Sequence, residues 1–279
     1  MKVFKLKLFI LTIVAFCFAI NISAQKTFNV DTIKGAKGSL KCVVQLPKLT
    51  ANQKCPFVVI MHGFTGNKNE NLLKQIADGL QKRGIASIRF DFNGHGESQG
   101  QFQNMTIENE IQDAIKVIDV VKKSKHADPA KIALLGHSQG GVVASMTAGI
   151  LGDKIIKALV LLAPAANIGE DTKNGMLLGT KFDKNNIPEF IQVWGHKVGK
   201  PYLLYAMNCD MYGTAAKFQG PVCIIHGSND KAVPFRFGKK YTEVYKNAKW
   251  ILQQDDDHGL SKHRPQTLAS IFNFYKKYL

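Results

Sequence analysis

A serine between glycines is the feature of this chain whose residue types and spacing most clearly suggest chemistry. Gly136-His137-Ser138-Gln139-Gly140 follows the apolar run at residues 131–135 and precedes residues 141–146, which are predicted to be helical. A serine on such a sharp strand-to-helix turn has strained backbone geometry and a hydroxyl directed into a cleft. The glycines leave room for the turn, because a Cβ at either position would meet the neighbouring strand or helix. The helix start also directs free N–H groups to a place where negative charge can develop, so Ser138 is the predicted nucleophile.

A serine hydroxyl is a weak nucleophile until a base takes its proton, and the base needs an acid to orient it. His258 is the predicted base, because it follows the last predicted strand on a loop ahead of the final helix. Asp230 ends the preceding strand and is the predicted acid. The alternative acids are residues 255–257, all aspartates directly before His258, although chain neighbours rarely orient a ring correctly. Four other histidines that neighbour a glycine at a strand end are expected to be structural or to shape the site: His62, His95, His137 and His226.

Two backbone N–H groups are expected to bind the oxyanion that an attack by serine creates. One is the N–H of Gln139, directly after the nucleophile. The other should come from the loop after the strand at residues 57–61, which reads His62-Gly63-Phe64-Thr65-Gly66. We predict the N–H of Phe64, with Gly63 as the alternative donor.

The rest of the chain shows the elements that must position these residues. The N-terminal part alternates as two strands, residues 28–33 and 39–46, and from Pro56 onward strands alternate with helices. The further strands are predicted at residues 57–61, 85–90, 131–135, 156–162, 221–226 and 249–252, and the further helices at 71–82, 107–121 and 268–278. This alternation predicts an α/β fold with a mostly parallel sheet, helices on both faces and an antiparallel N-terminal pair.

One segment interrupts the alternation. Residues 165–219 lie between two predicted core strands and show no clear strand. A crossover between parallel strands needs about a dozen residues, and this segment is several times longer. We therefore predict an inserted cap over the active site. It carries several aromatic residues: Phe182, Phe190, Trp194, Tyr202, Tyr205 and Tyr212.

The N-terminus has the order of a secretory signal. A basic start, residues 1–7, precedes an apolar stretch at residues 8–20 and small residues that end at Ala24. The apolar stretch is short for a membrane span, so we predict a signal peptide at 1–24, a mature domain at 25–279 and a secreted or periplasmic protein. An uncleaved anchor is the alternative. After cleavage no stable membrane insertion is expected.

The formal net charge is +16, yet the lysines are scattered and form no block with interleaved aromatic residues. This pattern favours a solvated lysine-rich surface over a nucleic-acid partner. The cysteines have no zinc-binding spacing, and His95 with Glu97 lacks a third ligand, so neither a metal nor another cofactor is predicted. Cys42 and Cys55 lie on candidate neighbouring strands, and the sequence leaves open whether they form a disulfide or remain free thiols.

Several motifs together resemble the cinnamoyl (feruloyl) esterases of gut bacteria, which belong to the α/β-hydrolase superfamily. The motifs are residues 62–66, 91–98, 136–141, 162–166, 226–230 and 257–259. The resemblance covers residues 26–279 and implies the α/β-hydrolase fold with Ser138, Asp230 and His258 as a triad. It further implies that Asp171 and Tyr202, in the cap, bind the phenolic end of the substrate, with Glu170 as the alternative to Asp171.

The reaction implied is that of a secreted serine carboxylesterase acting on small-molecule or carbohydrate-linked hydroxycinnamoyl esters through an acyl-enzyme. An acylglycerol lipase or an S33-type aminopeptidase on the same fold is the first alternative. An aminopeptidase would need an acidic pocket, for which Glu170, Asp171 and Asp183 are candidates. A non-catalytic binding protein is the second alternative, which the complete triad argues against. The sequence predicts no oligomeric state.

Overall fold

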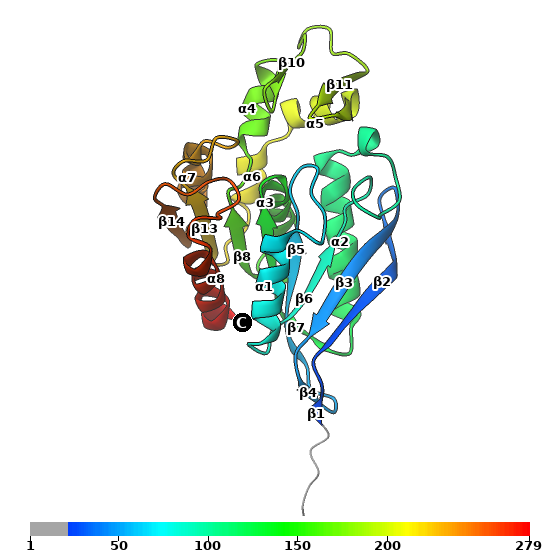
Figure 1. The fold of residues 1–279 in the computed structure, drawn as a ribbon, viewed down its shortest axis with the longest axis vertical. Coiled ribbons are helices and arrows are strands. Elements are labelled where there is room, and N and C mark those ends of the chain that lie inside the picture. Colours follow the sequence, from blue (N-terminus) through cyan, green and yellow to red (C-terminus); the bar gives the residue numbers. More distant parts are fainter. Residues whose placement is uncertain (1–21) are drawn as a thin grey trace, which may run out of the picture.

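The protein, described over residues 22–279 by a computed structural model, is built on an eight-stranded sheet (Figure 1). Its strands are β2 (Lys26–Gly35), β3 (Gly38–Leu46), β5 (Cys55–Met61), β6 (Ala86–Phe90), β7 (Ala127–His137), β8 (Ile156–Leu162), β13 (Val222–Gly227) and β14 (Ala248–Gln253). They lie in the order β14-β13-β8-β7-β5-β6-β3-β2. β2 and β3 are antiparallel, as is β3 with β6, and all other neighbours are parallel. The predicted, mostly parallel sheet with an antiparallel N-terminal pair is confirmed.

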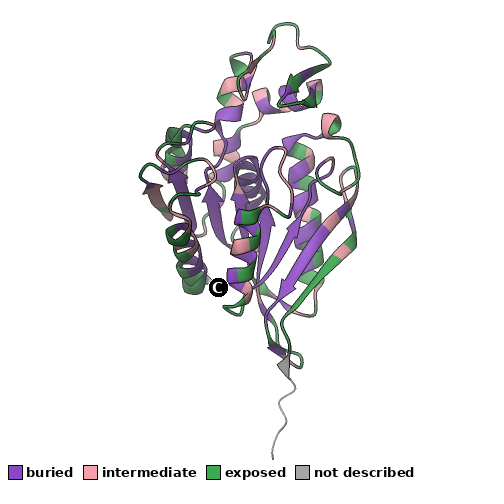
Figure 2. Ribbon diagram, in the orientation of Figure 1, coloured by how far each residue is buried: buried purple, intermediate pink, exposed green. Residues whose placement is uncertain are grey.

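Helices cover both faces of this sheet. The helices are α1 (Asn71–Gln81), α2 (Ile107–Lys123), α3 (Gln139–Leu151), α6 (Met211–Ala215), α7 (Phe235–Val244) and α8 (Arg264–Tyr278). α1 and α8 pack on one face, and α2, α3, α6 and α7 pack on the other. Figure 2 shows the result, with buried strands at the centre and exposed helix faces outside.

The spacing of apolar residues in each element explains which layer of the fold its side chains face. In β5 successive side chains alternate between the two helical layers, so Val58 and Ile60 face α1 while Val59 faces the other layer. Both faces of the strand are therefore buried, and each such side chain contributes about 1.5–3 kcal/mol. Thr106 is the N-cap of α2, and its hydroxyl accepts a hydrogen bond from the N–H of Asn109 (3.0 Å). This cap satisfies one of the free N–H groups of the first turn.

The segment between β8 and β13 differs from the prediction. It contains α4 (Asn167–Lys173), β9 (Met176–Leu177), β10 (Thr180–Lys181), β11 (Phe190–Val193), β12 (His196–Gly199) and α5 (Lys200–Asn208). The expectation of no strand was wrong, because two short antiparallel hairpins form there. Trp194 and Gly195 make the second hairpin turn with φ of 49° and 84°. Tryptophan rarely adopts such a conformation, so the turn lacked its usual sequence signal.

The cysteines are all free thiols among the described residues: Cys42, Cys55, Cys209 and Cys223. Cys42 lies on β3 and Cys55 on β5, and β6 lies between these strands. The expectation that their strands are neighbours was therefore wrong, and no disulfide joins them.

The predicted signal peptide falls outside the described residues for positions 1–21. Ile22–Ser23 form the short strand β1, which pairs with β4 (Leu49–Thr50). None of the helices between residues 22 and 279 combines the length and apolarity that crossing a bilayer requires.

Candidate active site

Ser138 lies on the strained turn that the sequence predicted, between the end of β7 and the start of α3. Its φ is 56° and its ψ is −123°, and its N–H donates to the carbonyl of Leu162 (2.9 Å). A Cβ on Gly136 would come within 2.0 Å of the carbonyl oxygen of Gly140, and a Cβ on Gly140 within 2.3 Å of the carbonyl oxygen of His62. Only glycine allows the helix and the strand to approach each other so closely beside Ser138.

Asp230 and His258 lie on the loops that follow β13 and β14, and they are hydrogen-bonded. His258 Nδ1 donates to Asp230 Oδ2 (2.7 Å), which also accepts from His226 Nε2 (3.1 Å). The other carboxylate oxygen accepts from the N–H groups of Ala232 (2.9 Å) and Val233 (2.8 Å). Burial alone would raise the pKa of Asp230, but the hydrogen bonds from His226 and His258 hold it well below its usual range. Asp230 is therefore an anion that orients the His258 ring.

The aspartates directly before His258 have other partners. Asp256 is fully buried and accepts from the N–H groups of Lys262 (2.9 Å) and His263 (3.1 Å). Asp257 accepts from Ser261. These acids shape the loop that carries His258, while Asp230 contacts its ring.

His137 connects the nucleophile turn to the same loop. Its Nε2 donates to the carbonyl oxygen of His258 (2.9 Å). Burial, together with the nearby His258, lowers the pKa of His137 to about 4, so its ring is neutral near pH 7. This contact is consistent with the role expected for His137, that of a residue that is structural or shapes the site.

Ser138 and His258 face a single small cavity of about 110 Å³. Its lining residues are Gly63, Phe64, Glu70, His137, Ser138, Ala165, Ile168, Leu178, Trp194, Ala232, Val233 and His258. Sequence reasoning did not single out Glu70, Leu178 or Val233. Burial raises the pKa of Glu70, the acidic residue of this lining.

Of the residues predicted to supply the two oxyanion donors, Phe64 lines this cavity and Gln139 directly follows the lining residue Ser138. Gln139 begins α3 directly after Ser138. Phe64 lies in the loop after β5, where a Cβ on Gly63 would come within 2.9 Å of the Ser138 Cβ. The Phe64 ring packs edge-on against Trp194, with 5.9 Å between ring centroids. The loop after β5 therefore lies directly against Ser138.

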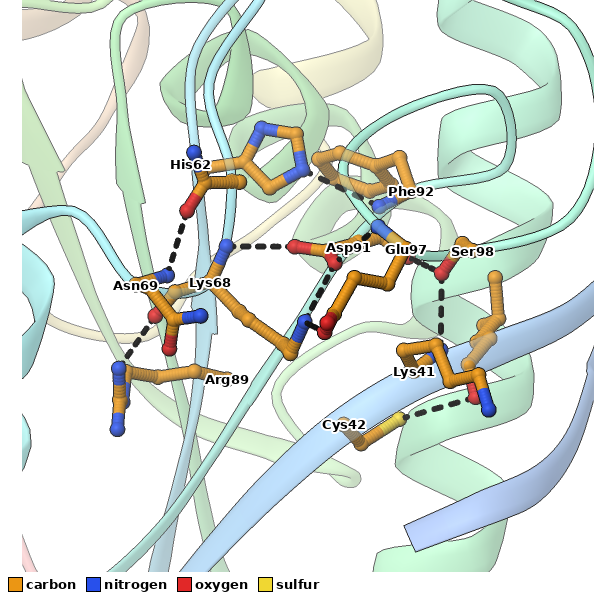
Figure 3. Close-up of polar contacts among 12 residues, drawn as sticks. Lys41, Cys42, His62, Lys68, Asn69, Arg89, Asp91, Phe92, Glu97 and Ser98 are labelled. Carbon is orange, nitrogen blue, oxygen red and sulfur yellow. Dashed lines mark hydrogen bonds and ion pairs between the residues drawn. The ribbon is translucent and has the colours of Figure 1, made fainter. Parts of the chain in front are cut away.

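A buried polar network holds the loop after β5 in place (Figure 3). The Lys68 N–H donates to Asp91 Oδ1 (2.6 Å), and its Nζ donates to Asp91 Oδ2 (2.7 Å) and to Glu97. Arg89, on β6, donates to the carbonyl of Lys68. Asp91 also accepts from the N–H of Glu97 (2.9 Å), so its carboxylate caps two backbone N–H groups. The Lys68 contact was missed, because no local pattern pairs residues so far apart.

The structure gives the Tyr202 hydroxyl a different partner from the expected phenolic substrate. Tyr202 is fully buried in α5, and its hydroxyl donates to Gln139 Oε1 (2.6 Å). Asp171, on α4, lines a neighbouring cavity of about 340 Å³ that shares Leu178, Trp194 and Ala232 with the Ser138 cavity.

The remaining acidic and metal-ligating candidates lie apart from the reacting groups. Glu170 is paired with Arg236 at 3.3 Å on the surface. His95 faces Glu110 (3.9 Å) rather than Glu97. Between residues 22 and 279, no three histidine, cysteine, aspartate or glutamate side chains are arranged to hold a metal ion.

Residues 52–200 match the protein family Hydrolase_4, described as serine aminopeptidase, S33. The chain belongs to this family. Among solved structures, Est1E from Butyrivibrio proteoclasticus with bound ferulic acid is similar at a TM-score of 0.81 and 33% identity, covering 86% of this chain and 95% of that one. This S33-family chain therefore has the α/β-hydrolase fold and resembles bacterial feruloyl esterases, as the motifs indicated.

Two curated relatives match most of this chain. Human protein ABHD12B is 30% identical over 233 residues, which are 80% of this chain and 61% of that protein. The lysophosphatidylserine lipase ABHD12 of Danio rerio is 24% identical over 70% of this chain and 48% of its own length. The chain thus spans about half to three fifths of these relatives. The family and the fold are those of hydrolases.

Proposed function

We propose that this hydrolase is a serine carboxylesterase that cleaves hydroxycinnamoyl esters through an acyl-enzyme on Ser138. The observation that carries the proposal is the 2.7 Å bond from His258 to the Asp230 carboxylate, with Ser138 and His258 on one cavity. The 33% identity to a structure that holds ferulic acid supports the acyl group.

The proposed mechanism follows from the order of these groups. His258 Nε2 takes the hydroxyl proton while Ser138 Oγ attacks the ester carbonyl. The N–H groups of Gln139 and Phe64 bind the oxyanion of the tetrahedral intermediate. His258 then gives the proton to the leaving alcohol. A water molecule, deprotonated by His258, attacks the acyl-enzyme and releases the acid, so the reaction needs no cofactor.

The cavity beside Ser138 is the proposed site of the aromatic acyl group. Leu178 and Trp194 belong to both cavities, so an aromatic ring between them would extend toward Asp171. The Asp171 carboxylate accepts from Asn167 Nδ2 (2.9 Å) and has lone pairs for a ring hydroxyl. In this proposal Asp171 recognises the phenol, and residues 165–219 act as the cap.

Lipid esters are the second candidate substrates, since a lysophosphatidylserine lipase is among the relatives. We further propose export of the protein after cleavage at Ala24, on the order of residues in the N-terminal segment.

The test compares methyl ferulate with methyl cinnamate, whose ring lacks the hydroxyl. Asp171→Ala should lower kcat/KM for methyl ferulate about tenfold and leave kcat/KM for methyl cinnamate nearly unchanged. The variant leaves the ring hydroxyl of ferulate without its partner, and an unpaired buried polar group costs about 1–3 kcal/mol. Glu170→Ala, on the exposed side of the same helix, is the matched control. Monoacylglycerols and aminoacyl p-nitroanilides complete the panel. Faster turnover of either class than of methyl ferulate would reject the feruloyl assignment.

A further inference from the structure

A buried carboxyl group lies directly behind the predicted oxyanion hole. Glu110, on α2, accepts hydrogen bonds from Gln139 Nε2 at both carboxyl oxygens (2.9 and 2.8 Å). At the other end of the Gln139 amide, Oε1 accepts from the Tyr202 hydroxyl (2.6 Å). At most 1% of each of these three residues is exposed. The Gln139 side chain is thus held at both ends, one residue after the nucleophile.

If the Glu110 carboxyl is ionised, a hydrogen-bond donor is missing between it and His95. His95 Nε2 lies 3.9 Å from Glu110 Oε1 and has no hydrogen-bond partner. His95 Nδ1 faces the carbonyl of Asn93 (3.4 Å), which can only accept, so the tautomer that satisfies this contact leaves Nε2 of the neutral ring as an acceptor. A carboxylate and this nitrogen would be two buried acceptors facing each other. A protonated Glu110 removes the conflict.

The titratable groups around Glu110 supply no balancing charge. On α2, the carboxylate of Asp113 adds repulsion, and on α5 the neighbour is the neutral Tyr202. Behind His95 lies His62, with 5.0 Å between ring centroids. No lysine or arginine forms an ion pair with Glu110 in the part of the chain that the structure describes. Burial, only partly opposed by the bond from Gln139, raises the pKa of Glu110 to about 8, and burial lowers that of His95 to about 3.

We propose that Glu110 is a positioning residue for the oxyanion hole, and that its uncharged, protonated form is the working one. It fixes the Gln139 side chain and thereby the Gln139 N–H at the start of α3. Ionisation places a negative charge behind the site where the oxyanion develops, which disfavours the tetrahedral intermediate. This role rests on the proposed esterase function, because it requires an oxyanion at Gln139.

The sign of the pH effect follows from the raised pKa. The carboxyl binds its proton more tightly in the folded protein than its ordinary value of 4.5 implies. Stability therefore declines as the pH rises from that value to about 8, and activity declines through about 8. At pH 9 a group with this pKa is about ten times more ionised than protonated, so kcat should be about tenfold below its neutral plateau.

Glu110→Gln tests the proposal, because glutamine imitates the protonated acid: its oxygen accepts from Gln139 and its amide donates toward His95. On p-nitrophenyl butyrate, with spontaneous hydrolysis subtracted, the variant should keep its neutral kcat and retain it at pH 9. Glu108→Gln, an exposed acid on the same helix, is the matched control and should show the wild-type decline. An unchanged decline in Glu110→Gln, or loss of its activity at every pH while folded, would overturn the proposal.

Two measurements separate this proposal from the proposed function and from a folding failure. A fluorophosphonate that modifies Ser138 reports the nucleophile. No reaction at Ser138 would overturn the proposed function and this role with it, whereas reaction with an unchanged alkaline decline would overturn the role of Glu110 alone. The infrared carbonyl band of a protonated carboxyl should be present in the wild-type protein at pH 7 and disappear through about pH 8. Absence of this titrating band would overturn the proposal without any variant.

Discussion

Replacing Asp230 by asparagine tests the arrangement of the proposed triad most directly. The carboxylate serves four donors, two imidazole rings on Oδ2 and two backbone N–H groups on Oδ1. Asparagine has one oxygen, which can satisfy only one of these pairs. If it keeps the backbone pair, its amide N–H₂ faces His258 Nδ1. His258 must then adopt the tautomer that carries its proton on Nε2, and it can no longer take the proton of Ser138.

The magnitude follows from losing the base while the cavity stays intact. A histidine held in the wrong tautomer lowers kcat by about 10³–10⁴-fold, equivalent to about 4–5.5 kcal/mol of transition-state stabilisation. KM should change little, since Asp230 does not line the Ser138 cavity. The assay is steady-state hydrolysis of p-nitrophenyl acetate, with a thermal melt to show that Asp230→Asn is folded.

Two matched variants control this experiment. Asp255→Asn changes an exposed acid near His258, and Asp256→Asn changes a fully buried one that bonds to the N–H groups of Lys262 and His263. Both should stay within tenfold of wild-type activity. Full activity in Asp230→Asn, or an equal loss in Asp256→Asn, would refute the assignment of the acid.

Further predictions follow from the same geometry. Ser138→Ala and His258→Ala should each lower kcat at least about 10³-fold with an unchanged melting temperature, measured on p-nitrophenyl acetate. Tyr202→Phe removes the donor to Gln139 Oε1 and should lower kcat equally for methyl ferulate and p-nitrophenyl butyrate; a loss confined to the ferulate ester would return Tyr202 to phenol recognition. Gly140→Ala should yield an inactive protein with a lower melting temperature, because its Cβ meets backbone atoms at the end of β5. Intact mass of the exported protein should show Gln25 as its first residue, and a retained signal would indicate a tethered enzyme.

The sequence predicted elements best where burial is complete. β8 has the predicted bounds, Ile156–Leu162, because every side chain in it except that of Lys157 is buried. β7 begins at Ala127, four residues before the predicted start, since Ala127 pairs with Cys55 across a register shift. α7 was not predicted, because its buried face consists of only Phe237, Gly238 and Tyr241 among basic and polar residues.

Some residues of the candidate site could be predicted from the sequence, and others could not. Ser138, Asp230 and His258 could be predicted from strand ends, because the carboxyl ends of parallel strands share one edge of the sheet. Contacts between distant segments had no local signal. The bonds of Gln139 to Glu110 and Tyr202 cross 29 and 63 residues of sequence, so no local pattern could pair these residues. The contacts of Lys68 also had no local signal, because in the sequence it resembled a solvated surface lysine.

Because β14 lies at the edge of the sheet, its separation is expected to abolish activity early in unfolding. β14 has one strand neighbour, β13, and it delivers His258, whereas Ser138 follows a strand paired on both sides. An edge strand can separate from its sheet at a lower free-energy cost than a central one. With rising denaturant, we expect the base to leave the cavity while the nucleophile turn is still intact. The protein would then be inactive but largely folded. Hydrogen exchange at the β14 amides should become faster as activity is lost, at a lower denaturant concentration than that at which the core unfolds.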